Sequence, residues 1–186
     1  MMYRIEHLTA LIALIGVFCA SLSAVAAPAL GDLAVADMQN FIVHDQPVPL
    51  PDIVLRDKEG KPVSLADLRG TVVLLNFWAT WCGPCRREMP TLDALSREMA
   101  GRPWRVIAVS VDRGGWKTSR AFLDQLGVAD IGLLLDSGSK AMRALGIIGL
   151  PTTLLIDGQG REIGRLVGPA EWNSAAALAL MKAATP

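Results

Sequence analysis

Short apolar runs alternate along most of the chain with longer segments of helical periodicity. The run TVVLLNFW is continuous and rich in β-branched residues, which is typical of a strand covered on both faces of a sheet. In the segment that follows, Leu92, Leu95 and Met99 recur at helical spacing, and Gly101 is a stop signal. Pro90 inside this segment predicts a kink. We expect strands at residues 71–78, 104–112, 131–136, 152–157 and 161–168, and helices at 83–101, 116–128, 137–147 and 170–185.

The order of these elements favours an α/β fold with a mixed central sheet flanked by helices. Strands joined through helices should run parallel with right-handed crossovers, whereas the last two strands, joined by GQG, should form an antiparallel hairpin. Residues 52–57 and 62–65 predict another hairpin at the start of the domain. Residues 27–50 are a lead-in, with a helical turn or two over 36–44 and extended, proline-rich chain after it. We expect residues 51–186 to form a single domain.

The composition agrees with one globular domain. Apolar residues make up 52% of the 186 residues, which argues against disorder. Lys and Arg together number 18, as do Asp and Glu, so the formal net charge is zero. This balance gives no support for binding nucleic acid or a strongly charged partner.

The first residues have the features of an export signal. A stretch of uncharged residues, Leu8–Ala27, follows a short start that carries Arg4, and Ala24-Val25-Ala26 matches the pattern of a signal-peptidase site. The same stretch is also long enough to span a bilayer. Residues 1–26 are therefore predicted to be a cleaved signal peptide or a retained membrane anchor. Either alternative places the rest of the protein outside the cytoplasm, in a periplasm.

Because Cys19 lies within this leader, the mature domain has two cysteines, Cys82 and Cys85, separated by two residues. A structural zinc site needs about four ligands, and the mature chain adds only His44 to the pair. A structural disulfide stabilises by closing a loop, and this loop is very short. A redox pair fits better, because Cys82 stands at the start of a predicted helix, where the dipole stabilises a thiolate. Cys82 would attack a disulfide, and Cys85, nearly one turn on, would resolve the mixed disulfide.

Several segments together resemble one family. FWATWCGPC after a buried strand resembles the thioredoxin superfamily, and GKPVSLADLRGTVVLLNFWATWCGPCRREMP, GLPTTLLID and GPAEW resemble its exported TlpA/ResA-like branch of thiol:disulfide reductases. The resemblance covers about residues 50–184 and implies a thioredoxin-like fold with an N-terminal hairpin extension. The segment 113–136 is longer than a thioredoxin needs, and in this branch it adds a helix and a strand. Trp104 and Trp116 are expected to pack in the core rather than bind a ligand.

The resemblance also implies roles around the cysteines. Cys82 would be the exposed nucleophile and Cys85 the buried cysteine, with Trp81 beside them and the pair Gly83-Pro84 tuning the reduction potential toward a reductase. In the loop opposite, Pro151 would follow a cis peptide bond, and Leu150 would lend backbone groups to a bound partner strand. A plain trans turn is the alternative, because most X–Pro bonds are trans.

Proton transfer should differ from that of cytosolic thioredoxins. Those proteins carry an aspartate six residues before the first cysteine, where this chain has Asn76, an amide that takes no proton at working pH. Asn76 is either part of the redox machinery or simply a hydrogen-bonded polar group near the sheet. Glu88 lies three residues after Cys85 on the same helical side, and in the ResA-like branch a glutamate here influences the cysteines. It would be either a proton acceptor for Cys85 or a solvated acid of the first helical turn.

The predicted activity is that of a protein-disulfide reductase that works on exported client proteins, as in cytochrome c or cytochrome oxidase maturation. It would need no cofactor and no metal besides the redox-active disulfide, and a membrane thiol transporter would supply its electrons. Three other activities are weighed against it. A disulfide-introducing oxidase is disfavoured by Gly-Pro between the cysteines, and a peroxiredoxin-like peroxidase by the second cysteine. A copper metallochaperone on this fold needs a distant histidine ligand, and His44 lies in the lead-in.

Overall fold

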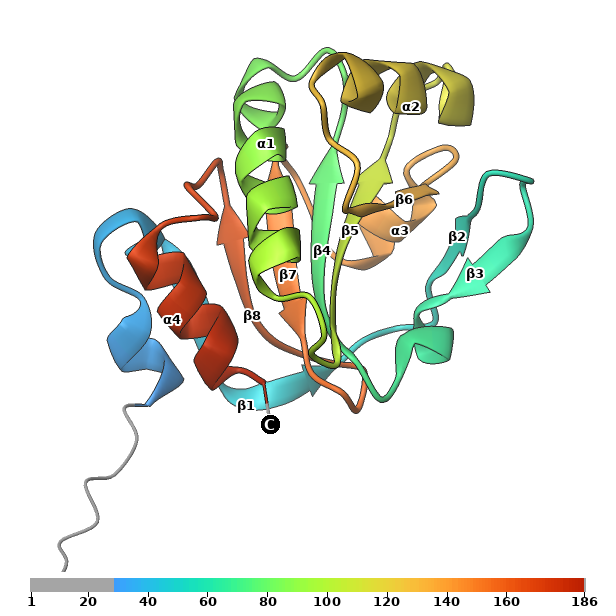
Figure 1. Ribbon diagram of the computed structural model, residues 1–186. Helices are drawn as coiled ribbons and strands as arrows, with labels where there is room; N and C mark the ends of the chain where they lie inside the picture. Colours follow the sequence, from blue (N-terminus) through green and yellow to red (C-terminus); the bar gives the residue numbers. More distant parts are fainter. Residues whose placement is uncertain (1–28, 186) are drawn as a thin grey trace, which may run out of the picture.

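The computed structural model describes residues 29–185. The predicted leader, its cleavage site and Cys19 lie outside this range. Residues 29–185 form a mixed sheet of eight strands in the order β1-β8-β7-β4-β5-β6-β2-β3, with helices on both faces (Figure 1). Within these residues, no helix is both long and apolar enough to cross a membrane.

The elements after residue 50 agree with the prediction. The strands are β2 (Val54–Arg56), β3 (Pro62–Ser64), β4 (Val72–Trp78), β5 (Trp104–Ser110), β6 (Gly132–Leu135), β7 (Thr152–Ile156) and β8 (Arg161–Val167). The helices are α1 (Gly83–Glu98), α2 (Gly115–Gln125), α3 (Lys140–Ala144) and α4 (Ala175–Ala183), with the 3₁₀ turns η1 (Leu30–Leu33), η2 (Ala36–Met38) and η3 (Leu65–Leu68). The predicted hairpins β2–β3 and β7–β8 are both antiparallel. The predicted insertion supplies α2 and β6.

The lead-in differs from the prediction. Within the predicted helical stretch 36–44, only Ala36–Met38 forms a helical turn, and Phe41–Pro49 forms β1, an edge strand paired antiparallel with β8. The edge of β8 is open to a further strand because Gly164 allows close approach. A Cβ there would lie 2.5 Å from Phe41 Cε1 and 2.6 Å from the Ile42 carbonyl oxygen. The lead-in therefore belongs to the same sheet as the rest of the domain.

Strand β4 is the centre of the molecule. It pairs parallel with β5 and antiparallel with β7, and every one of its residues is buried. Buried side chains from α1, α2 and α4 cover one face of the sheet, and those from α3 and η3 cover the other. Trp104 and Trp116 both pack in the core on the face covered by α1, α2 and α4, as predicted. This packing fixes the carboxyl end of β4, from which the chain enters the CxxC segment.

Candidate functional site

The cysteine pair lies at the junction of β4 and α1. Cys82 is the N-cap residue of α1, and its Sγ accepts a hydrogen bond of 3.3 Å from the backbone N–H of Cys85. Pro84 occupies the first turn, where a missing N–H leaves no hydrogen bond unmade. The two cysteines form a disulfide with a Cα–Cα distance of 5.3 Å. On reduction, the free N–H groups of this helix end and the helix dipole would favour a thiolate at Cys82.

The two cysteines differ in exposure less than predicted. Cys82 is only 5% exposed, and Cys85 is fully buried. The prediction of an exposed nucleophile is therefore corrected: Cys82 reaches solvent only as part of the wall of a groove of about 900 Å³. Trp81, which is 71% exposed, and Ile148, which is 95% exposed, stand at this groove as large apolar side chains in water. We call it the cysteine groove; its lining also includes Pro84, Val111, Asp112, Arg113, Gly114, Ser139, Met142, Gly149 and Leu150.

The loop opposite the cysteines has the predicted cis peptide bond, between Leu150 and Pro151. The Thr152 hydroxyl donates to the Gly149 carbonyl at 2.8 Å, and the N–H of Gly168 donates to the Pro151 carbonyl at 2.9 Å. Within residues 29–185, no hydrogen bond engages the backbone N–H or carbonyl of Leu150. Leu150 thus presents an unused backbone donor and acceptor beside the cysteine groove.

Glu88, three residues after Cys85 on α1, is buried at 2% exposure, so the alternative of a solvated first-turn acid is wrong. Its Oε1 accepts a hydrogen bond from Asn76 Nδ2 at 2.8 Å. Its Oε2 accepts from the backbone N–H of Ala170 and from Trp172 Nε1, both at 3.1 Å. Burial raises the pKa of Glu88 from 4.5 to about 7, although these hydrogen bonds and that of Asn76 oppose the rise. The carboxyl group is therefore poised to exchange a proton near neutral pH.

Asn76 joins Glu88 to the sheet. Its side-chain amide is fully buried and donates to both Glu88 and the hydroxyl of Thr153, the latter at 2.9 Å. Its Oδ1 has no hydrogen-bond partner in the described part of the chain. Asn76, at the position of the aspartate of cytosolic thioredoxins, therefore holds the carboxylate of Glu88 on the adjacent helix α1. Sequence reasoning identified Asn76 and Glu88 separately but missed both their contact and the role of Trp172.

A second group of polar residues supports the loop that precedes Cys82. Asp112 accepts hydrogen bonds from the Thr80 backbone N–H, the Thr80 hydroxyl and the Ser110 hydroxyl, at 2.8–2.9 Å. Ser119 of α2 donates to Ser110 at 2.7 Å. These contacts tie the β4–α1 loop to β5 and α2, and sequence analysis did not single them out.

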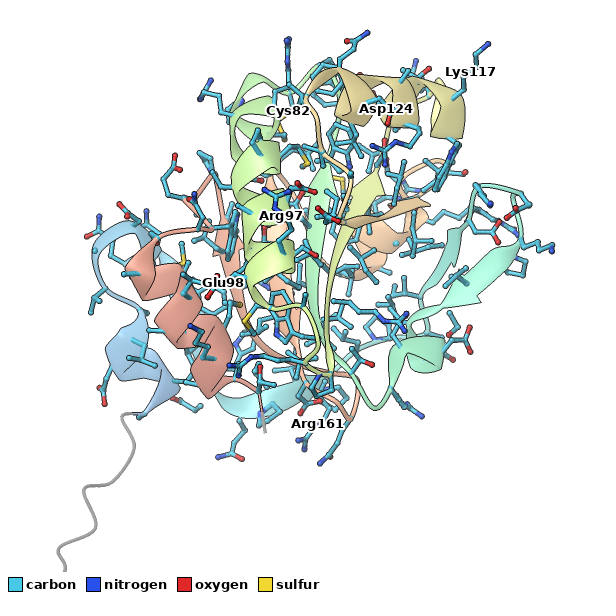
Figure 2. The ribbon with its side chains drawn as sticks, viewed as in Figure 1. Cys82, Arg97, Glu98, Lys117, Asp124 and Arg161 are labelled. Atoms are coloured by element: carbon cyan, nitrogen blue, oxygen red, sulfur yellow. A yellow bond between two sulfur atoms is a disulfide. The ribbon has the colours of Figure 1, made fainter. Side chains whose placement is uncertain are left out.

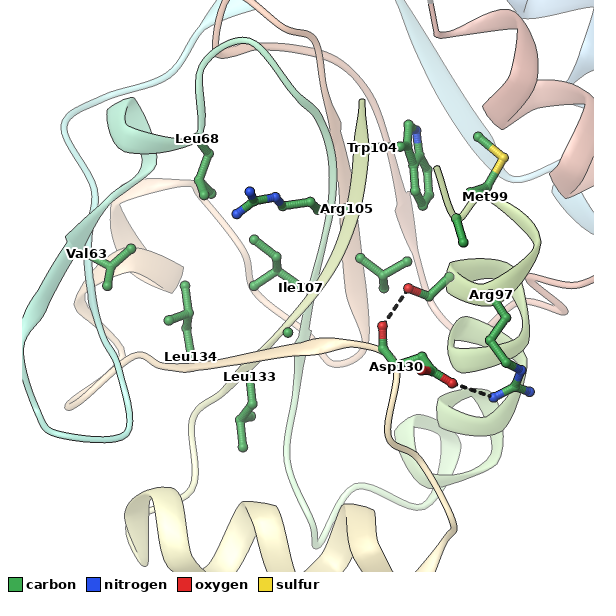
Figure 3. A pocket seen from close by; sticks show the side chains of 14 residues that line it. Val63, Leu68, Arg97, Met99, Trp104, Arg105, Ile107, Asp130, Leu133 and Leu134 are labelled. Atoms are coloured by element: carbon green, nitrogen blue, oxygen red, sulfur yellow. Dashed lines mark hydrogen bonds and ion pairs between the residues drawn. The ribbon is translucent and has the colours of Figure 1, made fainter. Parts of the chain in front are cut away.

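A hollow of about 540 Å³ at the other end of the sheet contains no cysteine (Figure 3). It opens where β5 begins, because β6 pairs with β5 only from Ile107 onward. Its lining is mainly apolar, with Trp104 on one side and an ion pair between Arg97 and Asp130 on another. It lies beside the C-terminal end of α1, whereas the cysteines lie at the N-terminal end, so it is separate from the redox site.

His44 also lies away from the cysteines. It is on β1, where its Nε2 contacts Glu162 Oε1 at 2.9 Å, while Cys82 lies at the opposite end of the molecule (Figures 1 and 2). Arg165 forms an ion pair with the same carboxylate. Burial by itself would raise the pKa of Glu162, but these two partners outweigh it and lower the pKa. Within residues 29–185, no group of three or more potential metal-binding side chains gathers.

A cysteine pair at the start of a helix, a cis-proline loop and a four-stranded β4–β5–β7–β8 core define a thioredoxin-fold thiol:disulfide oxidoreductase. The model of the AhpC/TSA family matches residues 48–161, and the chain belongs to this family, within the thioredoxin superfamily.

Curated and structural comparisons agree with this class. The thiol-disulfide oxidoreductase ResA of Bacillus thuringiensis is 36% identical over 118 residues, which cover 63% of this chain and 67% of that protein. A crystal structure from Chlorobium tepidum, provisionally assigned as the thiol:disulfide interchange protein DsbE, has a TM-score of 0.66 at 33% identity and covers 75% of this chain and 97% of the other. A thioredoxin-family thiol:disulfide interchange protein from Chlorobium tepidum TLS has a TM-score of 0.62 at 28% identity, covering 76% and 98%.

Proposed function

We propose that this protein reduces disulfides of exported client proteins in a periplasm, with Cys82 as the nucleophile and Cys85 as the resolving cysteine. The observation that carries the proposal is the cysteine pair at the N-terminus of α1, one member in the wall of a groove and the other buried. Gly83 and Pro84 occupy the first turn between the cysteines, and the family resemblance assigns them the tuning of the reduction potential toward a reductase.

The reaction proceeds in two exchanges. The thiolate of Cys82 attacks one sulfur of the client disulfide, forms a mixed disulfide and releases the other client sulfur as a thiolate. Cys85 then loses its proton, and its thiolate attacks the Cys82 sulfur. This second attack forms the Cys82–Cys85 disulfide and releases the second client thiolate. The client gains two electrons, and the protein ends in the disulfide state described above.

Glu88 takes the proton of Cys85 in the second exchange. Both residues are buried on one side of α1, three positions apart, and burial brings the pKa of Glu88 to about 7. A carboxylate with a pKa near the working pH is an effective acceptor. Asn76 has a positioning role, because its amide holds Glu88 against the sheet.

The cysteine groove receives an extended client segment. The side chain of Trp81 packs against the segment from one wall, and Leu150 offers its free backbone N–H and carbonyl from the other. Pro151 fixes the direction of that backbone. Adding a strand to exposed backbone groups is a common way to bind a peptide without reading its whole sequence.

The clients and the electron donor follow from the resemblance. Exported proteins whose cysteines must stay reduced for haem or copper, as in cytochrome c or cytochrome oxidase maturation, are the proposed clients. A membrane thiol transporter re-reduces Cys82–Cys85, because a reductase in an oxidising compartment needs a continuous supply of electrons. Residues 1–26 direct export and are either removed or kept as an anchor.

A Cys85→Ser variant tests the proposal. Without the resolving thiol, the protein should accumulate a stable mixed disulfide with its client, which non-reducing electrophoresis and mass spectrometry would identify. Cys82→Ser is the matched control and should trap nothing. If trapping depends on Cys85 instead of Cys82, the assigned order of attack is wrong.

The reduction potential tests the direction. A value near the −270 mV of thioredoxin supports a reductase, whereas one near about −120 mV would make the protein an oxidase. Consumption of peroxide in the absence of a thiol donor would instead support a peroxidase. Copper binding at sub-nanomolar affinity would support a metallochaperone.

A further inference from the structure

Positive charge gathers at the end of the molecule that carries the cysteine pair. The segments around the site, residues 79–87, 111–118 and 136–150, contain six exposed cationic side chains. These are Arg86, Arg87, Arg113, Lys117, Lys140 and Arg143. None of the six forms an ion pair within residues 29–185.

The same segments contain only two carboxylates, and both are turned inward. Asp112 is half-buried, and its oxygens accept hydrogen bonds from Thr80 and Ser110. Asp136 is 3% exposed, and its oxygens accept hydrogen bonds from the backbone N–H groups of Ala141 and Met142. Among the charged side chains of these three segments, a partner that approaches from solvent therefore meets the cations first; Asp124, exposed at the same end of the molecule (Figure 2), forms an ion pair with Arg120.

Two of the six cations border the cysteine groove, whereas Arg87 lines a separate pocket with Asp37 and Glu171. Arg113 is one of the groove's lining residues, and Lys140 directly follows the lining residue Ser139. Arg86 directly follows Cys85, and its guanidinium lies 5.0 Å from the ring centroid of Phe122. Lys117 lies at the same end of the molecule as Cys82 (Figure 2). A concave surface with charge of one sign concentrates partners of the opposite sign and raises their association rate.

We propose that the cysteine groove selects client segments in which acidic side chains flank the disulfide. This inference rests on the proposed function, in which Cys82 attacks a client disulfide, and it adds a preference for the charge of the client. The occupant is an extended polypeptide, because the exposed side chains of Trp81 and Ile148 and the free backbone of Leu150 fit apolar side chains and a peptide strand. Acidic residues of the segment would then lie against Arg113 and Lys140.

Two synthetic peptides test the inference. Both contain the same two-cysteine disulfide loop and the same apolar residues, and three aspartates or three lysines flank the loop. The second-order rate constant for their reduction by the reduced protein is measured by acid quench and alkylation. We expect the acidic peptide to react about 10-fold faster at 20 mM salt and the two rates to converge at 500 mM, because salt screens the attraction.

Charge-reversal variants separate steering from the intrinsic reactivity of the two peptides. In the double variant Arg113→Glu, Lys140→Glu, the rate for the acidic peptide divided by the rate for the basic peptide should fall at low salt to 1 or below. Arg102→Glu combined with Arg105→Glu, the same change of charge at two exposed positions beyond the C-terminal end of α1, is the matched control and should keep the wild-type ratio.

The outcomes distinguish the two proposals. If the reduced protein also fails to reduce a small uncharged disulfide, the proposed function is wrong. If it reduces that disulfide but shows the same peptide ratio in wild type and in the double charge reversal, selection by acidic flanks is wrong and the reductase proposal stands.

Discussion

Exchange of Glu88 for Gln changes the central buried charge of the site with little change in shape. An unfolded glutamic acid loses its proton near pH 4.5, whereas Glu88 in the folded protein keeps it until about pH 7. Between these values the folded state binds more protons, so raising the pH favours the unfolded state. A difference of two to three pH units corresponds to about 3 kcal/mol at 1.36 kcal/mol per unit. This stability is present below pH 4.5 and is lost by pH 7.

The assay is urea unfolding of the oxidised protein from pH 4 to pH 8, because the disulfide keeps the cysteines from titrating. The free energy of unfolding of Glu88→Gln, minus that of the wild type, should rise by about 3 kcal/mol across this range. In addition, the variant should be less stable than the wild type by a constant amount of about 1–3 kcal/mol at all pH values, because its new amide faces the amide of Asn76 and loses a hydrogen bond. Glu98→Gln, an exposed position of α1, gives the baseline for the same exchange. A difference that changes by less than about 1 kcal/mol would refute a buried carboxyl group with a raised pKa.

The same variant tests the chemistry. At pH 7 about half of the wild-type molecules carry Glu88 as a carboxylate able to take a proton. Glu88→Gln should slow resolution of the mixed disulfide by about 100-fold and remove its pH dependence near 7, while the first attack by Cys82 is less affected. Quenched-flow measurement of both steps would show this. An unchanged rate of resolution would contradict the role of Glu88 as acceptor, even if its pKa proved to be raised.

Three further predictions concern the groups around the site. Asn76→Ala removes a hydrogen bond to the Glu88 carboxylate, so the pKa of Glu88 should rise further, by about one unit. The pH midpoint of mixed-disulfide resolution should move up with it, and an unmoved midpoint argues against positioning by Asn76. Asp112→Asn weakens the support of the loop before the cysteines and should lower the free energy of unfolding by about 1–2 kcal/mol, measured in urea. Gly164→Ala places a methyl group against Phe41 and should free β1 from the sheet, which amide exchange along that strand would detect; protection equal to that of the wild type would contradict the close packing.

The site joins groups with different requirements. The Cys82 thiolate needs the polar end of a helix and contact with solvent, whereas Glu88 needs burial to raise its pKa. Both are satisfied on one helix because α1 enters the core within its first two turns. The cations around the groove add a long-range electrostatic attraction. This attraction should affect the rate of encounter with the client more than the rate of thiol–disulfide exchange.

The sequence alone determined the order and type of the elements after residue 50. It could do so because continuous apolar strands and periodic helices are local signals, read from neighbouring residues. It also determined the position of the CxxC pair at the start of a helix, since Gly83 and Pro84 favour that boundary. The helical spacing of Cys85 and Glu88 placed these two side chains on one side of α1.

Only the tertiary structure decided what surrounds those residues. Glu88 is buried because Asn76, Ala170 and Trp172 cover it, and these come from segments 12, 82 and 84 residues away. The lead-in forms a strand by pairing with β8, where Gly164 leaves room for Phe41 and Ile42, and no local pattern in residues 27–50 could reveal that partner. Burial, and with it the pKa of a carboxyl group, depends on contacts between distant segments. A sequence pattern reports which side of an element faces inward, but it does not report which groups meet there.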